Sequence, residues 1–310
     1  MSKANKNTKI EELNIIKDYY KTNNLKIEYI GEGWHNRIYL INRKDVFRLT
    51  ATEHGRDKMS IYNKVSPMLK LPINIPRFKT FNIISNNKYK AFAIYTYHKG
   101  NCVNFDKLDE NSILKLAQSM SIIHNFKYEN TFGKYNITVE LEQQFENLSK
   151  YVFSYLNKNE QLFIEKLYND YLKSSISQKV KLVFIHGDLN AKNLLQNNNA
   201  LSCILDWDNI QFNDPMFDFS RFPFKFFNKI IEMYPNKEAL NENLIERYLF
   251  YRMRKHTYKM YYSSVNPLYA DKHLQHIFEF RKVKKDYEKH YMEYINRFEK
   301  TKKCDGIFNI

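Results

Sequence analysis

Several patterns are missing from this chain, and each absence excludes a class of protein. Its three cysteines, Cys102, Cys203 and Cys304, lie far apart and form no CxxC pair. They therefore provide neither a zinc motif nor a disulfide framework, and we expect reduced thiols in a cytoplasmic protein. No apolar run approaches the roughly 20 residues that span a membrane. The first nine residues also lack the apolar core of a secretion signal.

Glycine and proline are scarce, with seven of each, and the sequence shows no internal repeat and no long low-complexity linker. Hydrophobic residues make up 43% of the chain, including 24 Tyr and 23 Phe, which is typical of a globular protein and not of a disordered one. A chain of 310 residues is long enough for one large domain or for two lobes with a substantial core.

Acidic residues are outnumbered, because 49 Lys and Arg face 34 Asp and Glu and leave a net charge of +15. A positive field favours anionic partners such as nucleotides, nucleic acids or acidic lipids. The simpler interpretation is a solvated lysine-rich surface. Because no helix-turn-helix, RRM or zinc motif accompanies the charge, the sequence gives little support for a nucleic-acid-binding module.

The stretch that organises the chain begins at an apolar run, residues 182–185. This run leads into His186-Gly187-Asp188, and Asn193 follows five positions after the aspartate. A short apolar run that ends in a polar turn is typical of a strand that delivers side chains to a loop.

A second apolar run, residues 201–205, delivers Asp206-Trp207-Asp208 in the same way, after a turn-like segment at 196–200. Two short strands flanking that turn would place Asp188, Asn193 and Asp206 at neighbouring loop ends. Phosphoryl transfer requires such a cluster of oxygens, because a carboxylate must orient the attacking hydroxyl and oxygen ligands must hold Mg²⁺ against the nucleotide phosphates.

The spacing also matches a known motif. Kinase catalytic loops read H-R-D-L-x-x-x-N, with D-F-G downstream, whereas this chain reads His-Gly-Asp-Leu-Asn-Ala-Lys-Asn and then Asp-Trp-Asp. These substitutions resemble the aminoglycoside phosphotransferase and choline kinase branch of the kinase-like fold. The continuation at 213–219 resembles that family's G-D-P-x-x-D-L segment. A single His-x-Asp would be better explained by Asp and Asn capping the turns of an ordinary hairpin.

The resemblance implies roles for the residues of this stretch. Asp188 would orient the acceptor hydroxyl and take its proton. Asn193 and Asp206 would hold Mg²⁺, and Asp208, where kinases have glycine, would add an outer-sphere or second-metal contact. The cofactors implied are ATP or GTP together with Mg²⁺.

The N-terminal part supplies candidates for binding the nucleotide. Gly31 and Gly33 lie in a strand–turn–strand segment, where glycines let the backbone approach phosphates. In the next expected strand, residues 45–49, Arg48 stands where kinases carry a phosphate-binding lysine, and arginine can grip phosphate with two donors. The alternative is an outward-facing strand arginine.

Two further segments complete the comparison with kinases. The expected helix at 56–70 contains no glutamate to pair with the lysine position, and Asp57 is one of the nearest substitutes. The segment 95–100 resembles the hinge between lobes, so Thr96 and His98 are candidates for binding adenine through their main chain.

Apolar periodicity predicts further helices. They span residues 9–21, 111–126, two helices within 136–174, 242–262 and 274–298. His124 and Asp218 are interpreted as structural, and the aromatic stripes of the last helices as core. In the family that the chain resembles, the C-terminal helices wall the acceptor site. The alternative is therefore that these aromatic residues stack on a substrate ring.

The expected fold is thus α+β and protein-kinase-like, with a β-rich N-lobe at 1–97 and a helical C-lobe at 98–310. The expected function is a Mg²⁺-dependent small-molecule kinase of the aminoglycoside-phosphotransferase type, with antibiotic resistance as one possible role. The alternatives are a non-catalytic kinase-like structural protein, suggested by Arg48 and the missing glutamate, and a nucleic-acid-binding module. The sequence determines neither the acceptor nor the oligomeric state, although a charge of +15 works against polycationic acceptors.

Overall fold

The computed structural model describes residues 3–32, 36–84, 88–128, 137–173, 180–235, 240 and 243–305. Its contacts divide the chain into two compact units. Unit 1 comprises residues 1–122 and 191–210, and unit 2 comprises 123–190 and 211–310. The lobes expected at 1–97 and 98–310 stay a prediction.

Unit 1 contains a five-stranded antiparallel sheet of order β1-β2-β3-β5-β4 and a three-stranded sheet of order β6-β8-β9. The strands are β1 (Ile27–Glu32), β2 (Asn36–Ile41), β3 (Asp45–Thr50), β4 (Phe78–Ile83), β5 (Ala91–Thr96), β6 (Asn101–Cys102), β8 (Leu194–Asn197) and β9 (Ala200–Ile204). The helices are α1 (Lys3–Tyr20), α2 (Glu53–Val65), most of α3 (Glu110–His124), and the 3₁₀ turns η2 (Ala191–Asn193) and η3 (Trp207–Asn209).

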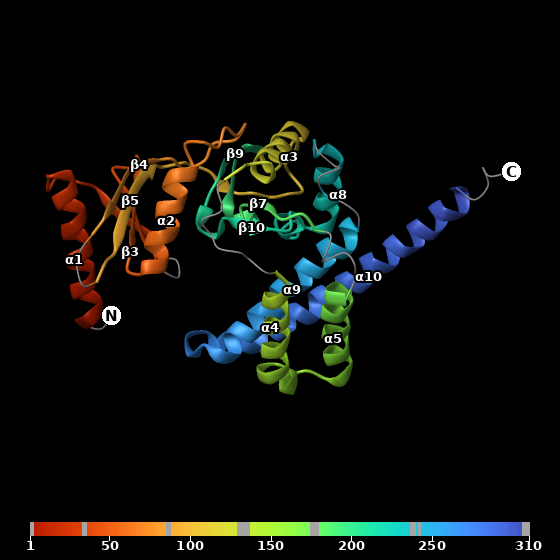
Figure 1. Ribbon diagram of the computed structural model, residues 1–310. Helices are drawn as coiled ribbons and strands as arrows, with labels where there is room; N and C mark the ends of the chain where they lie inside the picture. The colour runs from red at the N-terminus through yellow and green to blue at the C-terminus, as the bar shows by residue number, and fades with distance from the viewer. Residues whose placement is uncertain are drawn as a thin grey trace. The chain divides into compact units, whose positions relative to one another are not determined.

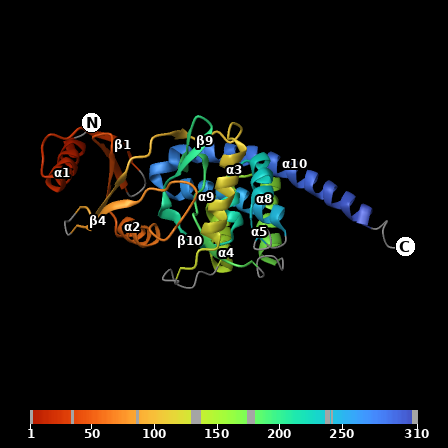
Figure 2. The ribbon, with the colours of Figure 1, turned by 90° about the horizontal axis from the view of Figure 1, so that it is seen from above.

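The two faces of the larger sheet are covered by different helices, α1 and α2 (Figures 1 and 2). Ile16 of α1 shares a buried cluster with Phe47 and Leu49, whereas Met59 of α2 packs with alanines of β5. Because side chains alternate along a strand, Arg48 lies on the opposite face from Phe47 and Leu49. The sequence pattern of β3 thus directs one charged side chain toward the α2 side.

Helix α2 begins three residues before its predicted start. The side chain of Thr52 accepts a hydrogen bond from the backbone N–H of Gly55 at 3.0 Å and caps the helix. The expectation that this helix lacks a glutamate was therefore wrong, since Glu53 is its first residue. Glu53 is exposed, however, and pairs with Arg56 and Lys90.

The hairpin expected after the catalytic loop is confirmed. Strands β8 and β9 pair antiparallel, and Asn198 and Asn199 between them have φ of 49° and 67°. Two consecutive residues with positive φ are typical of the type I′ turn, whose twist matches that of the flanking strands, and asparagine tolerates this conformation.

Unit 2 is mainly helical and includes one two-stranded antiparallel sheet, β7 with β10. Its elements are α4 (Ile137–Tyr151), η1 (Phe153–Tyr155), α5 (Lys158–Lys173), β7 (Val183–Ile185), β10 (Gln211–Asn213), α7 (Met216–Phe219), α8 (Phe224–Met233), α9 (Leu244–Val265), η5 (Pro267–Lys272) and α10 (His273–Asp305). None of the helices in the described part of the chain is long and apolar enough to cross a membrane.

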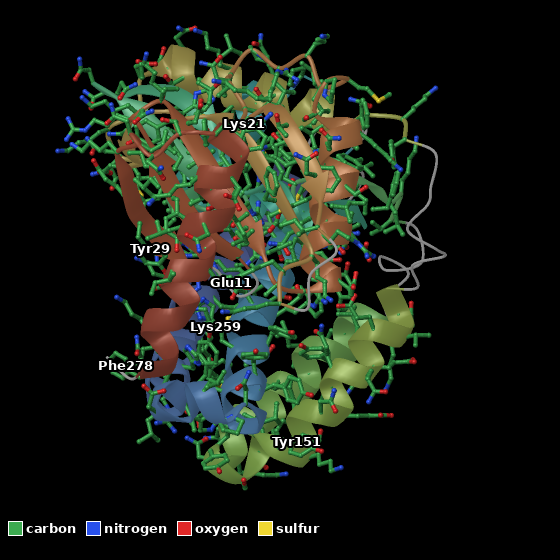
Figure 3. All side chains as sticks on the ribbon, turned by 90° about the vertical axis from the view of Figure 1, so that its left-hand side faces the viewer. Glu11, Lys21, Tyr29, Tyr151, Lys259 and Phe278 are labelled. Atoms are coloured by element: carbon green, nitrogen blue, oxygen red, sulfur yellow. The ribbon has the colours of Figure 1, made fainter. Side chains whose placement is uncertain are left out.

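Aromatic residues fill the core of unit 2. Tyr171 stacks on Phe250 with ring centroids 3.8 Å apart, and Phe227 stacks on Tyr248 at 4.1 Å. The expectation that the aromatic stripes of the last helices are core holds for Tyr248 of α9, but Phe278 of α10 is 70% exposed (Figure 3).

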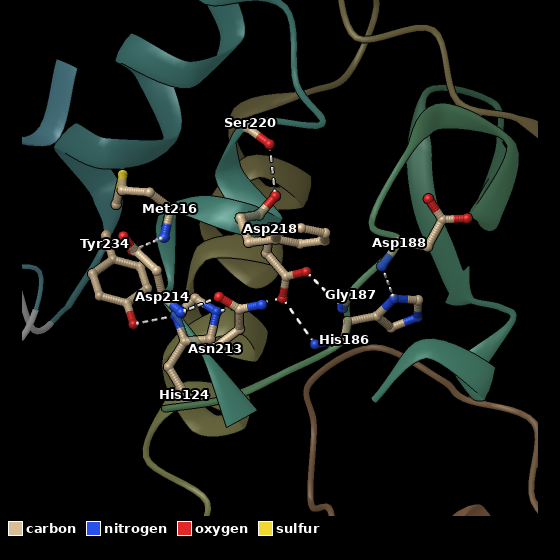
Figure 4. A network of polar contacts seen from close by, with 11 residues as sticks. His124, His186, Gly187, Asp188, Asn213, Asp214, Met216, Asp218, Ser220 and Tyr234 are labelled. Atoms are coloured by element: carbon tan, nitrogen blue, oxygen red, sulfur yellow. Dashed lines mark hydrogen bonds and ion pairs between the residues drawn. The ribbon is translucent and has the colours of Figure 1, made fainter. Parts of the chain in front are cut away.

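Two buried aspartates of the 213–219 segment organise the polar interior of unit 2 (Figure 4). Asp218 is fully buried, and its carboxylate accepts hydrogen bonds from the backbone N–H groups of His186 at 2.9 Å and Gly187 at 2.8 Å. His124 lies 3.5 Å away from the same carboxylate. Burial alone would raise the pKa of Asp218, but these partners outweigh it and hold the pKa below its usual range. The structural roles expected for His124 and Asp218 are confirmed.

Asp214, the other buried carboxylate, joins this segment to α9. It accepts from Nε of Arg247 at 2.8 Å, from the Tyr171 hydroxyl at 3.2 Å and from the backbone N–H of Met216 at 2.8 Å. A buried carboxylate requires such partners, because burying an uncompensated charge is costly. The segment is thereby anchored to the helical core.

Replacing Asp218 tests how firmly this carboxylate holds the loop before Asp188. In Asp218→Asn one amide oxygen remains to accept a hydrogen bond, but the amide NH₂ faces the second N–H donor. We expect a loss of about 1–3 kcal/mol in unfolding free energy, measured by thermal or urea denaturation. The control is Asp170→Asn, an exposed partner of Lys166.

The lowered pKa of Asp218 also predicts how its contribution to the unfolding free energy changes with pH. Because the folded-state pKa of Asp218 is lowered, its contribution is present above the usual carboxyl pKa and is lost as pH falls through the lowered value. The difference in unfolding free energy between wild type and Asp218→Asn should therefore become smaller at acidic pH. If the Asp218→Asn protein were as stable as the wild type at neutral pH, the bracing role would be contradicted.

Candidate active site

Asp188 lies at the end of the loop that leaves β7. Gly187 has φ of 81°, a conformation that glycine adopts without strain, and this explains why the loop has glycine where kinases have arginine. The backbone N–H of Asp188 donates to Nδ1 of the buried His186 at 3.2 Å (Figure 4). The loop is thus fixed on both sides of the turn, and the Asp188 side chain is half-buried.

Arg221 is the main side-chain neighbour of Asp188 that the sequence interpretation missed. Its Nε lies 3.9 Å from Oδ1 of Asp188, and its Nη2 donates to the carbonyl of Gly187 at 3.2 Å. The guanidinium also lies 4.8 Å from the centre of the Phe217 ring. The only signal in the sequence was its place three residues after Asp218.

In unit 1, Asn193 and Asp206 come from the two sides of the β8–β9 hairpin. The backbone N–H of Leu205 donates to the carbonyl of Asn193 at 2.7 Å, which brings the residues before β8 and after β9 together. Asp206 is exposed, and its φ of 57° is uncommon for a residue other than glycine. Such backbone conformations cluster at functional sites.

The chemistry of these side chains fits a magnesium ion bound with a nucleotide. Mg²⁺ prefers oxygen ligands and commonly takes one or two protein side chains, completing its shell with phosphates and water. Asn193 and Asp206 supply two oxygen donors of this kind. In the described ranges, no group of three or more His, Cys, Asp or Glu could hold a metal by itself.

Asp208 has a partner that the sequence did not predict. Its Oδ2 forms an ion pair with Nη2 of Arg48 and accepts a hydrogen bond from the Asn36 side chain at 3.3 Å. One carboxylate oxygen therefore joins β2, β3 and η3. The metal contact expected for Asp208 stays a prediction.

Arg48 is only 8% exposed, so the alternative of an outward-facing arginine is wrong. Its Nε is buried and has no hydrogen-bond partner among the residues that the structure describes. Asp57, the expected substitute for the missing glutamate, instead accepts from Arg56 at 2.7 Å. A buried guanidinium with an unused donor is suited to an anion such as a phosphate.

Tyr95 interacts electrostatically with both Arg48 and Asp206. Burial raises the pKa of its hydroxyl, Arg48 lowers it and Asp206 raises it, so both charges act on the same phenol. Arg48 and Asp206 therefore both lie within electrostatic range of Tyr95.

The remaining candidates line the sheet and the segment that follows it. A Cβ atom at Gly31 would meet nothing within 4 Å, so the space over this residue is open, and Gly33 lies outside the described residues. Thr96 is exposed at the end of β5, and His98 is half-buried. Burial lowers the pKa of His98. Their nucleotide-binding roles stay predictions.

The fold resembles solved structures of antibiotic kinases. The GDP and kanamycin complex of APH(2″)-IIIa has 18% identity and a TM-score of 0.79, covering 89% of this chain and 99% of its own. The streptomycin–ATP complex of APH(2″)-IIa has 18% identity and a TM-score of 0.67, covering 88% and 95%. The macrolide 2′-phosphotransferase MphH from Brachybacterium faecium has 14% identity and a TM-score of 0.61, covering 88% and 97%.

At these identities the structures establish the fold alone, which is the expected kinase-like α+β fold with a β-sheet N-terminal region and a helical C-terminal part. No curated protein matches the sequence. Residues 26–254, however, match the phosphotransferase enzyme family, a range that includes every site residue discussed above. The chain belongs to the phosphotransferase enzyme family.

Proposed function

We propose that this protein transfers the γ-phosphoryl group of ATP or GTP to a hydroxyl group of a small molecule. The observation that carries the proposal is the carboxylate of Asp188 on a loop whose backbone is bound by the buried Asp218. A general base must be held in a fixed place to position its hydroxyl, and this loop provides that rigidity.

In the proposed reaction the acceptor oxygen forms a bond to the γ-phosphorus while the bond to the β-bridging oxygen breaks. The proton of the hydroxyl passes to Asp188, and the nucleoside diphosphate leaves. Mg²⁺, when bound with the nucleotide, would neutralise charge on the phosphate oxygens. Asn193 and Asp206 would hold the ion, and Arg48 together with the backbone of Gly31 and Gly33 would bind the phosphates.

We propose that Asp208 replaces the glutamate that kinases place on the helix, with Arg48 replacing the lysine. The ion pair between them fixes the guanidinium on the α2 side of β3. This arrangement answers the main argument for a non-catalytic protein, because the two departures from the kinase pattern form one pair. Composition supports a cytoplasmic location, and the names of the structural neighbours support a role in antibiotic resistance.

The first test is Asp188→Asn. The amide can still accept a hydrogen bond but cannot take the proton, so we expect turnover to fall by about 10²–10⁴-fold. Nucleotide affinity and thermal stability should stay close to wild type. Phosphoryl transfer is measured by coupled detection of the nucleoside diphosphate over a panel of hydroxyl acceptors, and full activity in Asp188→Asn would reject the base.

The second test concerns the metal. Asp206→Ala should abolish the dependence of nucleotide binding on Mg²⁺, and Asn193→Ala should weaken it, because each removes an oxygen ligand. Calorimetric titration of ATP with and without Mg²⁺ measures this. The same magnesium dependence in Asp206→Ala and wild type would count against the metal role.

The third test concerns the ion pair. Arg48→Ala should raise the nucleotide Kd by about 10–100-fold, the range expected for losing a hydrogen bond to a charged group. Arg48→Lys should recover part of the loss, and Asp208→Asn should give a smaller rise, because the guanidinium loses its orienting partner. Asp57→Ala is the matched control and should bind like wild type. Titrations of Arg48→Ala that overlay wild type would exclude a role in nucleotide binding.

A further inference from the structure

A cationic face of α9 lies beside the proposed base in unit 2. Arg252, Lys255 and Lys259 recur at intervals of three and four residues, so they share one side of the helix. Lys255 lies within electrostatic range of Asp188 and of Arg221, since both affect the pKa of its ammonium. Positive charge therefore gathers next to the carboxylate that would receive the acceptor's proton.

The partners of these cations differ. Lys259 pairs with Glu279 at 2.9 Å, and Arg252 donates to the carbonyl of Phe222 at 2.9 Å. Lys255, in contrast, forms no ion pair or hydrogen bond with any residue in the described part of the chain. Its ammonium therefore has no direct partner among the described residues and is balanced only through its longer-range interaction with Asp188.

Arg221 is a second cation near Asp188, and one of its N–H donors has no hydrogen-bond partner among the described residues. Its Nη2 donates to a carbonyl, and its Nε is buried without a hydrogen-bond partner among the described residues, 3.9 Å from Oδ1 of Asp188. The carboxylate of Asp188 thus lies 3.9 Å from the Nε of Arg221 and within electrostatic range of Lys255. Glu140, another acidic residue of unit 2, already forms an ion pair with Arg254, whose Nη2 lies 2.6 Å from Oε1 of Glu140.

Burial makes this excess charge unfavourable in the absence of an anion. The pKa of Lys255 falls to about 8, mainly because of burial and then because of Arg221, while Asp188 opposes the change. His256 adds no charge of its own, since burial lowers its pKa to about 3. Desolvated cations of this kind gain most from an anionic ligand, because little hydration remains to be lost.

We propose that the acceptor of this kinase carries an anionic group, a carboxylate or a phosphate, which binds Lys255 and Arg221 while its hydroxyl faces Asp188. This inference rests on the proposed function, because it takes Asp188 as the base. A polycationic acceptor would meet like charges at the same place, and the electrostatic cost would oppose its binding.

Three small probes test the charge of the acceptor with a constant carbon skeleton. Glycerol, glycerate and glycerol 3-phosphate are titrated by calorimetry into protein saturated with MgADP, so that the nucleotide phosphates already occupy Arg48. Kanamycin serves as the cationic probe. We expect both anions to bind at least tenfold more tightly than glycerol, and the stronger of the two identifies carboxylate or phosphate as the preferred group.

The variants locate the binding. Lys255→Gln should weaken the anionic probes about tenfold or more and leave glycerol unchanged, whereas Lys255→Arg should retain most of the affinity. Lys166→Gln, which removes an exposed lysine of α5 that pairs with Asp170, is the matched control and should behave as wild type. Circular dichroism and MgADP affinity verify that each variant is folded.

Each outcome decides a separate question. Equal binding of glycerol and the anions, tighter binding of kanamycin, or anion binding unaffected by Lys255→Gln would overturn the anionic acceptor and leave the kinase function standing. Absence of MgADP binding would instead count against the proposed function. In that case the same titrations in Arg48→Ala without nucleotide still test whether Lys255 binds the anions.

Discussion

The loop that carries Asp188 depends on one buried carboxylate. Asp218 has no exposure to solvent, yet it remains ionised because the backbone N–H groups of His186 and Gly187 and the ring of His124 surround it. A buried charge is tolerable only with such partners, so the requirement to satisfy Asp218 dictates the conformation of the loop. The same conformation carries Asp188 out of β7 at a positive-φ glycine. Stability and the position of Asp188 are therefore coupled in these few hydrogen bonds.

A second ion pair plays the corresponding role in unit 1. Arg48 points to the α2 side of the sheet because Phe47 and Leu49 occupy the α1 side. Asp208 meets the guanidinium there, and Asn36 adds a hydrogen bond to the same oxygen. In the kinase pattern a helix glutamate pairs with the cation at this strand position, whereas here Arg48 pairs with Asp208 in the turn after β9. The turn that follows Asp206 is thereby tied to β3.

The proposed nucleotide-binding residues and the proposed acceptor-binding residues differ in how their positive charges are balanced. Arg48 is balanced by Asp208, while Arg221 and Lys255 share the single carboxylate of Asp188. The net charge of +15 was uninformative by itself, because most lysines of such a chain are solvated. The positions of Arg221 and Lys255 in the structure made part of this net charge informative. A half-buried ammonium near the proposed base would affect the choice of ligand in a way that a surface lysine would not.

From the sequence alone, the family resemblance of the motifs around Asp188 predicted the kinase-like fold, and the local pattern of apolar runs and turn residues predicted the hairpin that follows the loop. The sequence also determined that Arg48 sits on a strand. Only the tertiary structure decided that Arg48 pairs with Asp208, 160 residues away, and not with Asp57. It likewise placed Arg221 and Lys255 beside Asp188. Long-range pairings depend on which helix faces and loop ends pack together, and that information resides in the whole core and not in any single segment.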